Sequence, residues 1–185
     1  MRDPSPALLT LEPLLDAVRA GVEEAGWTLS GLQKTTSHQF EGRWAGDSSR
    51  SAYLFFHRPE GPEWASVDVF LDETSQGLLG NLALVVDGCR LSELGDVAGC
   101  LDTLGRLSAQ ALPDGHRTPL TLRLRLDDGT APPGSADTEF RFKLRIPRSA
   151  MAAGAPSVSA LASATVRSFD QVLRDPALAP YLTRE

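Results

Sequence analysis

The sequence predicts an α+β fold in which an antiparallel β-sheet is flanked by helices, in the order helix, strand meander, helix, β-hairpin, helix. The first observation is the apolar period, which is helical in three stretches and switches to every second position between them. The second is that short polar turns join the alternating stretches, which implies antiparallel pairing.

The first helix is expected between Leu11 and Gly26. Thr10 is placed to cap its start, Pro13 is tolerated in the first turn, and Gly26 suits the C-terminal stop. Its apolar stripe consists of Leu11, Leu14, Leu15, Val18, Val22 and Ala25.

Five strands are expected after this helix, because the apolar period changes from helical spacing to alternation. The alternating stretches are Trp27–Gln33, His38–Trp44, Tyr53–His57, Ala65–Leu71 and Leu82–Val86.

A second helix is predicted from Ser92 to Leu112, and we expect it to be the central helix of the domain, with one face on the sheet. Gly95 and Gly99 lie four residues apart on its polar side, a spacing that permits a second backbone to come close. These two glycines are candidates for a dimer contact, and chance is the alternative in a chain with 16 glycines.

The cleanest alternation in the chain predicts a β-hairpin from strands at Leu120–Leu126 and Phe140–Ile146, joined by a loop at Asp127–Thr138. One face of the hairpin is apolar. The other face carries five cations, which we call the basic hairpin face: Arg123, Arg125, Arg141, Lys143 and Arg145.

The cations of the basic hairpin face repel one another, so they must reach water, pair with carboxylates or meet an acidic partner. A solvated outer face and a site for an acidic protein segment both fit this pattern. Nucleic acid is disfavoured, because the chain has a formal charge of −6 and no aromatic side chains stand among these cations.

A last helix is predicted from Ser157 to Arg174, after a linker of small residues at Ala150–Pro156. The tail beyond this helix is too apolar for a solvated end, so we expect it to dock on this subunit or another. Its apolar residues include Leu178, Tyr181 and Leu182.

The composition is that of a single domain spanning residues 1–185, with 42% hydrophobic and 23% charged residues. The N-terminal stretch lacks the apolar region of a signal peptide, and no run of about 18 apolar residues occurs, so we expect a cytoplasmic protein without a membrane partner. Cys89 and Cys100 have neither Cys-x-x-Cys spacing nor a nearby histidine, which predicts free thiols. We expect no metal and no cofactor.

No short motif assigns an enzymatic activity. Asp47 belongs to a Gly-Asp-Ser triplet of the kind found near the nucleophile of some lipase-like hydrolases, but a polar turn explains the triplet better. A hydrolase or a ligand pocket between the sheet and the helices would need His57, Asp68 or Asp47 to converge in space.

The order of the elements resembles that of the YbjN-like proteins and the class I type III secretion chaperones, which share a small α+β fold. The resemblance covers nearly the whole chain and rests on residues 11–26, 27–57, 92–112, 120–146 and 157–174. It implies a homodimer that binds other proteins without chemistry, as a small cytoplasmic chaperone or adaptor.

We therefore expect a non-enzymatic, homodimeric protein-binding module whose protein client is steered by the basic hairpin face. Two other classes stay open. A nucleic-acid-associated protein would use the same face with steep salt dependence. A small-ligand-binding or hydrolase domain would need a pocket with converging titratable side chains.

Overall fold

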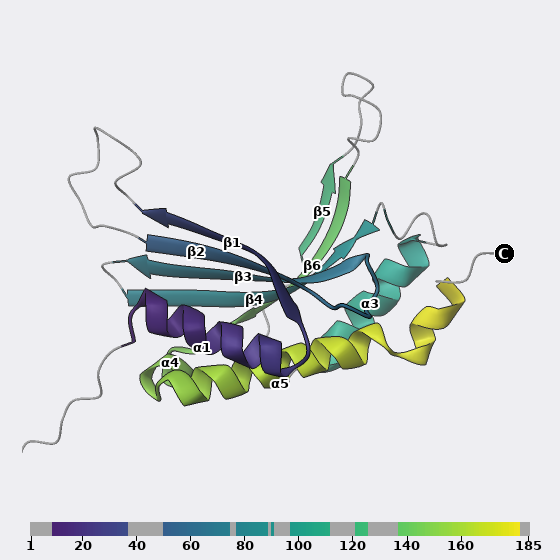
Figure 1. The fold of residues 1–185 in the computed structure, drawn as a ribbon. Helices are drawn as coiled ribbons and strands as arrows, with labels where there is room; N and C mark the ends of the chain where they lie inside the picture. The colour runs from purple at the N-terminus through teal and green to yellow at the C-terminus, as the bar shows by residue number, and fades with distance from the viewer. Residues whose placement is uncertain are drawn as a thin grey trace, which may run out of the picture.

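The computed structural model describes residues 9–36, 50–74, 77–88, 90, 97–111, 121–125 and 137–181 (Figure 1). The helices are α1 (Leu11–Glu24), α3 (Val97–Ala111), α4 (Arg148–Ala152), α5 (Ala155–Leu173) and the 3₁₀ helix η2 (Pro176–Tyr181). The strands are β1 (Thr28–Thr36), β2 (Arg50–His57), β3 (Ala65–Thr74), β4 (Gly77–Asp87), β5 (Thr121–Arg125) and β6 (Asp137–Arg145). The predicted α+β class is confirmed.

The strands form one antiparallel sheet of six, in the order β1-β2-β3-β4-β6-β5. The first four strands follow one another as a meander, and the β5–β6 hairpin joins it through β6. The hairpin register places Leu122 opposite Phe140, which confirms the predicted pairing. In β3, Ala65, Val67 and Val69 are buried while the residues between them are half-buried, as the alternation predicts.

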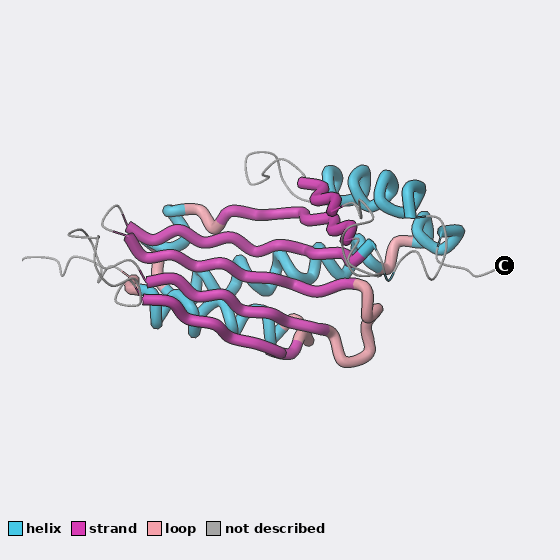
Figure 2. The backbone as a smooth tube through the Cα atoms, turned by 90° about the horizontal axis from the view of Figure 1, so that it is seen from above, coloured by secondary structure: helices cyan, strands magenta, loops and turns pink. Residues whose placement is uncertain are grey.

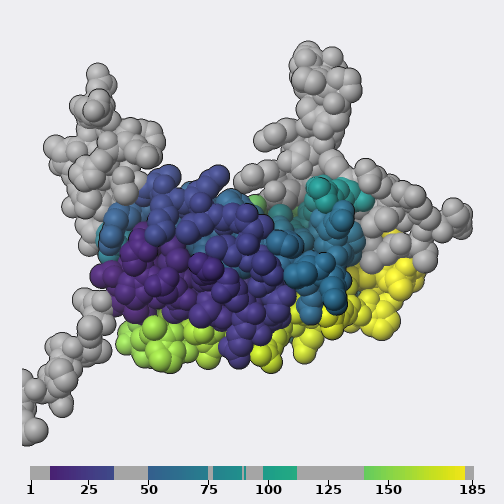
Figure 3. Space-filling model, in the orientation of Figure 1, coloured from purple at the N-terminus to yellow at the C-terminus, as the bar shows by residue number. Residues whose placement is uncertain are grey.

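Helices α1 and α5 lie side by side against one face of the sheet (Figures 1, 2 and 3). Gly21 brings the two helices close, since a Cβ at this position would overlap the carbonyl oxygen of Ser159 on α5. Phe169 of α5 packs edge-on against Phe142 of β6, with ring centroids 5.9 Å apart. The apolar stripes that fill this core consist of Leu14, Val18 and Val22 from α1 and Val158, Ala162, Val166 and Phe169 from α5.

Helix α3 packs mainly against α5 and η2 (Figure 1). This corrects the expectation that the stretch from Ser92 to Leu112 is a central helix lying on the sheet. The buried positions of α3 include two hydroxyl side chains, Thr103 and Ser108, and its apolar stripe is shorter than that of α5. The long apolar stripe of α5 therefore takes the place on the sheet that we assigned to α3.

The predicted linker at Ala150–Pro156 is wrong, because α4 occupies Arg148–Ala152 and α5 begins at Ala155. Alanine and methionine favour helix, so the short stretch folds despite its small side chains. Gly154 separates the two helices with φ at 97°, a conformation that glycine adopts without strain.

The apolar tail docks on its own subunit, one of the two outcomes the sequence allows. Leu178 in η2 is 1% exposed, and Tyr181 packs against the same core. The predicted strand at His38–Trp44 and the tail residue Leu182 lie outside the described residues. None of the described helices is long and apolar enough to cross a membrane.

Candidate binding site on the open face of the sheet

The sheet face opposite α1 and α5, which we call the open face, has no described helix over β2, β3 and β4 (Figures 1 and 2). Its side chains are those that alternate with the buried core residues of each strand. Two large apolar side chains on this face, Tyr53 and Leu79, are each 39% exposed. The open face is thus a surface with apolar area that the described helices do not cover.

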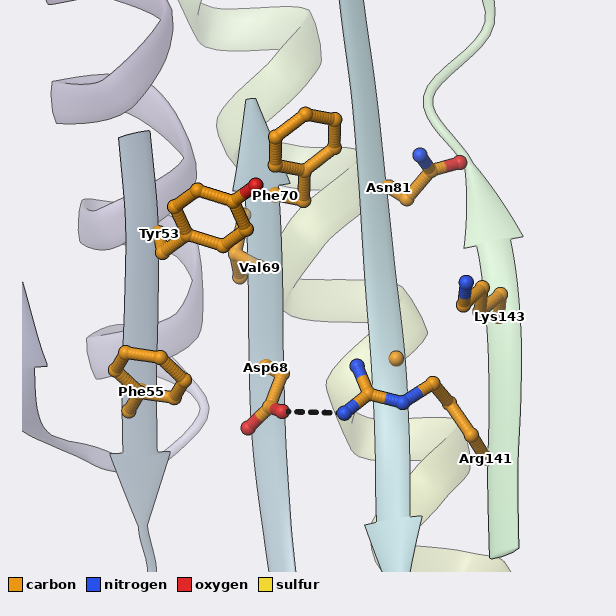
Figure 4. Close-up of a pocket in the computed structure, with 9 residues that line it drawn as sticks. Tyr53, Phe55, Asp68, Val69, Phe70, Asn81, Arg141 and Lys143 are labelled. Carbon is orange, nitrogen blue, oxygen red and sulfur yellow. Dashed lines mark hydrogen bonds and ion pairs between the residues drawn. The ribbon is translucent and has the colours of Figure 1, made fainter. Parts of the chain in front are cut away.

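The strand register creates a hollow on the open face. One row across the sheet runs from Phe55 through Asp68 and Ala83 to Lys143, and the next row contains Asn81 on β4. Alanine and asparagine are short, whereas the side chains on the flanking strands are long, so β4 forms the floor of a hollow of about 370 Å³ (Figure 4). It is lined by Tyr53, Phe55, Asp68, Val69, Phe70, Asn81, Ala83, Arg141 and Lys143.

One wall of the hollow is aromatic. Tyr53 on β2 and Phe70 on β3 are cross-strand partners whose ring centroids are 4.8 Å apart, with an angle of 40° between the rings. Phe55 extends this wall along β2 (Figure 4). Aromatic cross-strand pairs stabilise a sheet, and they also present flat apolar surface to a ligand.

The opposite wall is cationic. Arg141 on β6 reaches across β4, and its Nη2 donates to Oδ2 of Asp68 at 3.1 Å (Figure 4). Ser66 donates to the other oxygen of the same carboxylate at 3.4 Å. Arg141 and Asp68 are only 22% and 16% exposed, so this pair is more strongly coupled than a surface salt bridge. With Lys143, the lining carries two cations and one carboxylate, a formal charge of +1.

The structure divides the basic hairpin face into two parts. Arg141 and Lys143 line the hollow, and Arg145 is exposed farther along β6, opposite Asn81. In the backbone register of β5, Arg123 lies opposite Glu139 and Arg125 opposite Asp137. On one side, the cations of β6 therefore face β4 and, beyond it, the aromatic side chains of β3 and β2. Two acidic residues precede these cations in β6.

The other predicted positions lie apart from the hollow. Gly99 is half-buried on α3, whereas Gly95 and Asp47 fall outside the described residues. His57 is exposed at the end of β2 and does not line the hollow that contains Asp68, so the described members of that titratable cluster do not converge. Cys100 is buried on α3, and Cys89 lies outside the described residues. Within the described ranges, no group of three or more His, Cys, Asp or Glu side chains could hold a metal ion.

The aromatic wall is the part of the site that sequence reasoning missed. Tyr53, Phe55 and Phe70 are far from the hairpin cations along the chain, and only the strand order brings β2 and β3 within three strands of β6. One signal was present: β2 carries apolar side chains at consecutive positions, which is typical of a strand with contacts on both faces.

No protein-family model, no curated protein and no solved structure matches this chain.

Proposed function

We propose that this protein is a non-enzymatic protein-binding module, a chaperone or adaptor, that holds an acidic segment of another cytoplasmic protein on the open face. The observation that carries the proposal is the row of cations on β6, which faces the aromatic wall of the hollow across β4. Arg141, Lys143 and Arg145 project from alternate positions of one strand to the open face.

The spacing of these cations supports an extended client. Side chains at alternate positions of a strand are roughly 7 Å apart on one face. The acidic side chains of an extended segment with the same alternation have the same spacing, so each can meet one cation of β6. The aromatic wall adds apolar contact next to the charge pairs, a combination that gives a protein interface both affinity and orientation.

A binding role, and not a chemical one, is supported by the state of Asp68. This carboxylate lines the hollow, but Arg141 and Ser66 both donate to it. A carboxylate held in this way positions the guanidinium group of Arg141 for a ligand. The chain as a whole is acidic, with a formal charge of −6, so it repels a long polyanion such as nucleic acid. A cationic site on this chain therefore favours a short acidic segment that meets only the cations of β6.

The test uses a synthetic peptide with three glutamates at alternate positions, separated by threonines, titrated by calorimetry. Reversing two exposed or half-buried cations, Lys143→Glu with Arg145→Glu, is expected to weaken binding by about tenfold or more, because each pair contributes up to about 1 kcal/mol. The matched control is Arg148→Glu with Arg174→Glu, which changes the net charge equally at exposed positions outside the open face. That control should leave the affinity unchanged.

Equal losses in both double variants would contradict the proposal, because they would show that only net charge matters. So would tighter binding of a single-stranded oligonucleotide than of the acidic peptide, since that outcome favours the nucleic-acid class. Titration at rising salt concentration should weaken the peptide complex of the unmodified protein more than that of the β6 variant.

A further inference from the structure

We propose that Asn81 binds the main chain of the client segment, through paired hydrogen bonds to the N–H and C=O groups of one client residue. This inference rests on the proposed function and specifies how the open face recognises a client. It is carried by the place of Asn81 on the floor of the hollow, by the state of its side-chain amide and by the geometry of an extended chain.

Asn81 lies on the floor of a trough above β4. In the register it lies between Phe70 on β3 and Arg145 on β6, whose side chains are longer than its own. The backbones of β3 and β6 are roughly 10 Å apart, which leaves room for one extended chain between their side chains. Figure 4 shows the Asn81 amide at the end of the hollow away from the pair of Asp68 and Arg141, which crosses β4.

The side-chain amide of Asn81 is available to a ligand. Asn81 is half-buried, and its amide makes no hydrogen bond to another residue that the structure describes. By contrast, the open-face carboxylates of Asp68 and Asp72 accept hydrogen bonds from Arg141 and Ser51. Asparagine is also disfavoured in strands, and β4 is paired on both sides. A carboxamide here offers two N–H donors and one oxygen acceptor.

An extended chain in the trough needs such a partner. Successive side chains of an extended segment point to opposite sides, and its N–H and C=O groups point at right angles to them. With the acidic side chains directed to β6 and those between them directed to the aromatic wall, the main-chain groups of every second residue face the floor.

One carboxamide matches the groups that face it. The N–H and C=O groups of one residue in a strand point the same way, as they do in an antiparallel pair, so the amide of Asn81 can donate to one and accept from the other. The contact does not depend on the side chain of that client residue. The open face therefore selects for charge spacing and for an extended main chain.

The test uses the peptide of three glutamates separated by threonines, capped at both ends, and a series in which each peptide bond in turn is replaced by an ester. An ester lacks the N–H donor and has a weaker carbonyl acceptor, while the side chains stay the same. We expect one ester to weaken binding by about three- to tenfold, the effect of a single hydrogen bond, and the others to change it by less than about twofold.

Nuclear magnetic resonance of the unmodified protein gives a direct readout of the same contact. The side-chain N–H signals of Asn81 should shift downfield when the all-amide peptide is added. Those of Gln33 should stay in place, because Gln33 is an exposed amide on β1, opposite Tyr53 in the same row across the sheet.

Two matched variants complete the test. Asn81→Ala removes the amide and leaves the trough open, so it should weaken binding of the all-amide peptide by about three- to tenfold. The sensitive ester should then cost nothing further, as a double-mutant cycle requires for two groups that contact each other. Gln33→Ala is the control and should leave both the affinity and the ester effect unchanged.

The outcomes separate this inference from the proposed function. The main-chain contact is refuted if no ester weakens binding, or if the sensitive ester costs as much in Asn81→Ala as in the unmodified protein. In either case, a loss of binding in Lys143→Glu with Arg145→Glu would still support an acidic client. An ester effect that also disappears in Gln33→Ala refutes the contact as well. If the all-amide peptide does not bind, the proposed function fails, and the contact with Asn81 fails with it.

Discussion

Asp170 on α5 ties together three parts of the chain that are far apart in the sequence. Its Oδ1 accepts from the indole Nε1 of Trp27, just before β1, at 3.2 Å, and the same oxygen pairs with Arg58 in the connection between β2 and β3. Arg58 and Asp170 are 21% and 14% exposed, so neither charge is well solvated. Removing one member of such a pair leaves the other charge poorly compensated, which costs more than the pair contributed.

Asp170→Asn is therefore expected to lower the free energy of unfolding by about 2 kcal/mol, less than for a fully buried pair because some water reaches the site. Asp102→Asn is the matched control, since Asp102 is also in a helix and pairs with an arginine, but both partners are mostly exposed. It should cost less than about 0.5 kcal/mol. Urea denaturation of both variants measures the difference, and similar losses would show that the Asp170 cluster is no stronger than a surface pair.

At the scale of the elements, Gly21 allows α1 and α5 to pack closely. The position lies in the middle of α1, where alanine would ordinarily favour the helix over glycine by about 1 kcal/mol. Here the carbonyl of Ser159 and the methyl group of Ala162 occupy the space that a methyl group would need.

Gly21→Ala is expected to lower the free energy of unfolding by about 1–3 kcal/mol, because α1 and α5 must move apart over a packed core. The control is Ala20→Gly at the neighbouring exposed position, which should cost about 1 kcal/mol through helix propensity alone. Thermal and urea unfolding give both values. A stabilised Gly21→Ala variant would show that the helices can shift without cost.

The elements differ in how far sequence could predict them, and the reasons are physical. Period-2 alternation marks β3 and β6 plainly, because each residue type reports which side of the strand is buried. An amphipathic stripe on a helix reports only that one face is covered, so α3 and α5 looked equally able to lie on the sheet. The strand order could not be predicted either, because no local sequence pattern indicates that β6 pairs with β4 and not with another strand of the meander.

The same limit explains the partial prediction of the site. Arg141 and Lys143 can be predicted from the sequence because they alternate with core residues on a regular strand, and both line the hollow. Ala83 has no such signal in the sequence, although its short side chain also lines the hollow. A short side chain becomes informative only when its cross-strand neighbours are known, and those neighbours are set by the register.

For the whole molecule, we predict a homodimer that uses the side of α3 that carries the half-buried Gly99. Gly99 and Arg106 are seven residues apart, which is two turns of the helix, so they lie on the same side of α3. The buried Cys100 and Leu104 lie on other sides. A residue without a side chain at this position permits close approach of a second backbone.

Sedimentation equilibrium across a wide range of protein concentrations is expected to show a monomer–dimer equilibrium. Gly99→Leu should raise its dissociation constant by about tenfold, because an inserted side chain in a close contact costs about 1–3 kcal/mol. Ala109→Leu adds the same side chain roughly 15 Å farther along α3 and should leave the constant unchanged. A protein that sediments as a monomer throughout, or equal effects of both variants, would contradict the prediction.

The strand order also determines when the open face of the sheet is complete during synthesis of the chain. The two ends of the Asp68–Arg141 pair are separated by 73 residues, and β6 must leave the ribosome before it can pair with β4. Until then the meander from β1 to β4 has an incomplete sheet edge and only the aromatic half of the hollow. Non-local pairing of this kind forms late in folding. The open face is therefore complete only once β6 has paired with β4, so under the proposed function a nascent chain stalled before β6 would not yet bind its client.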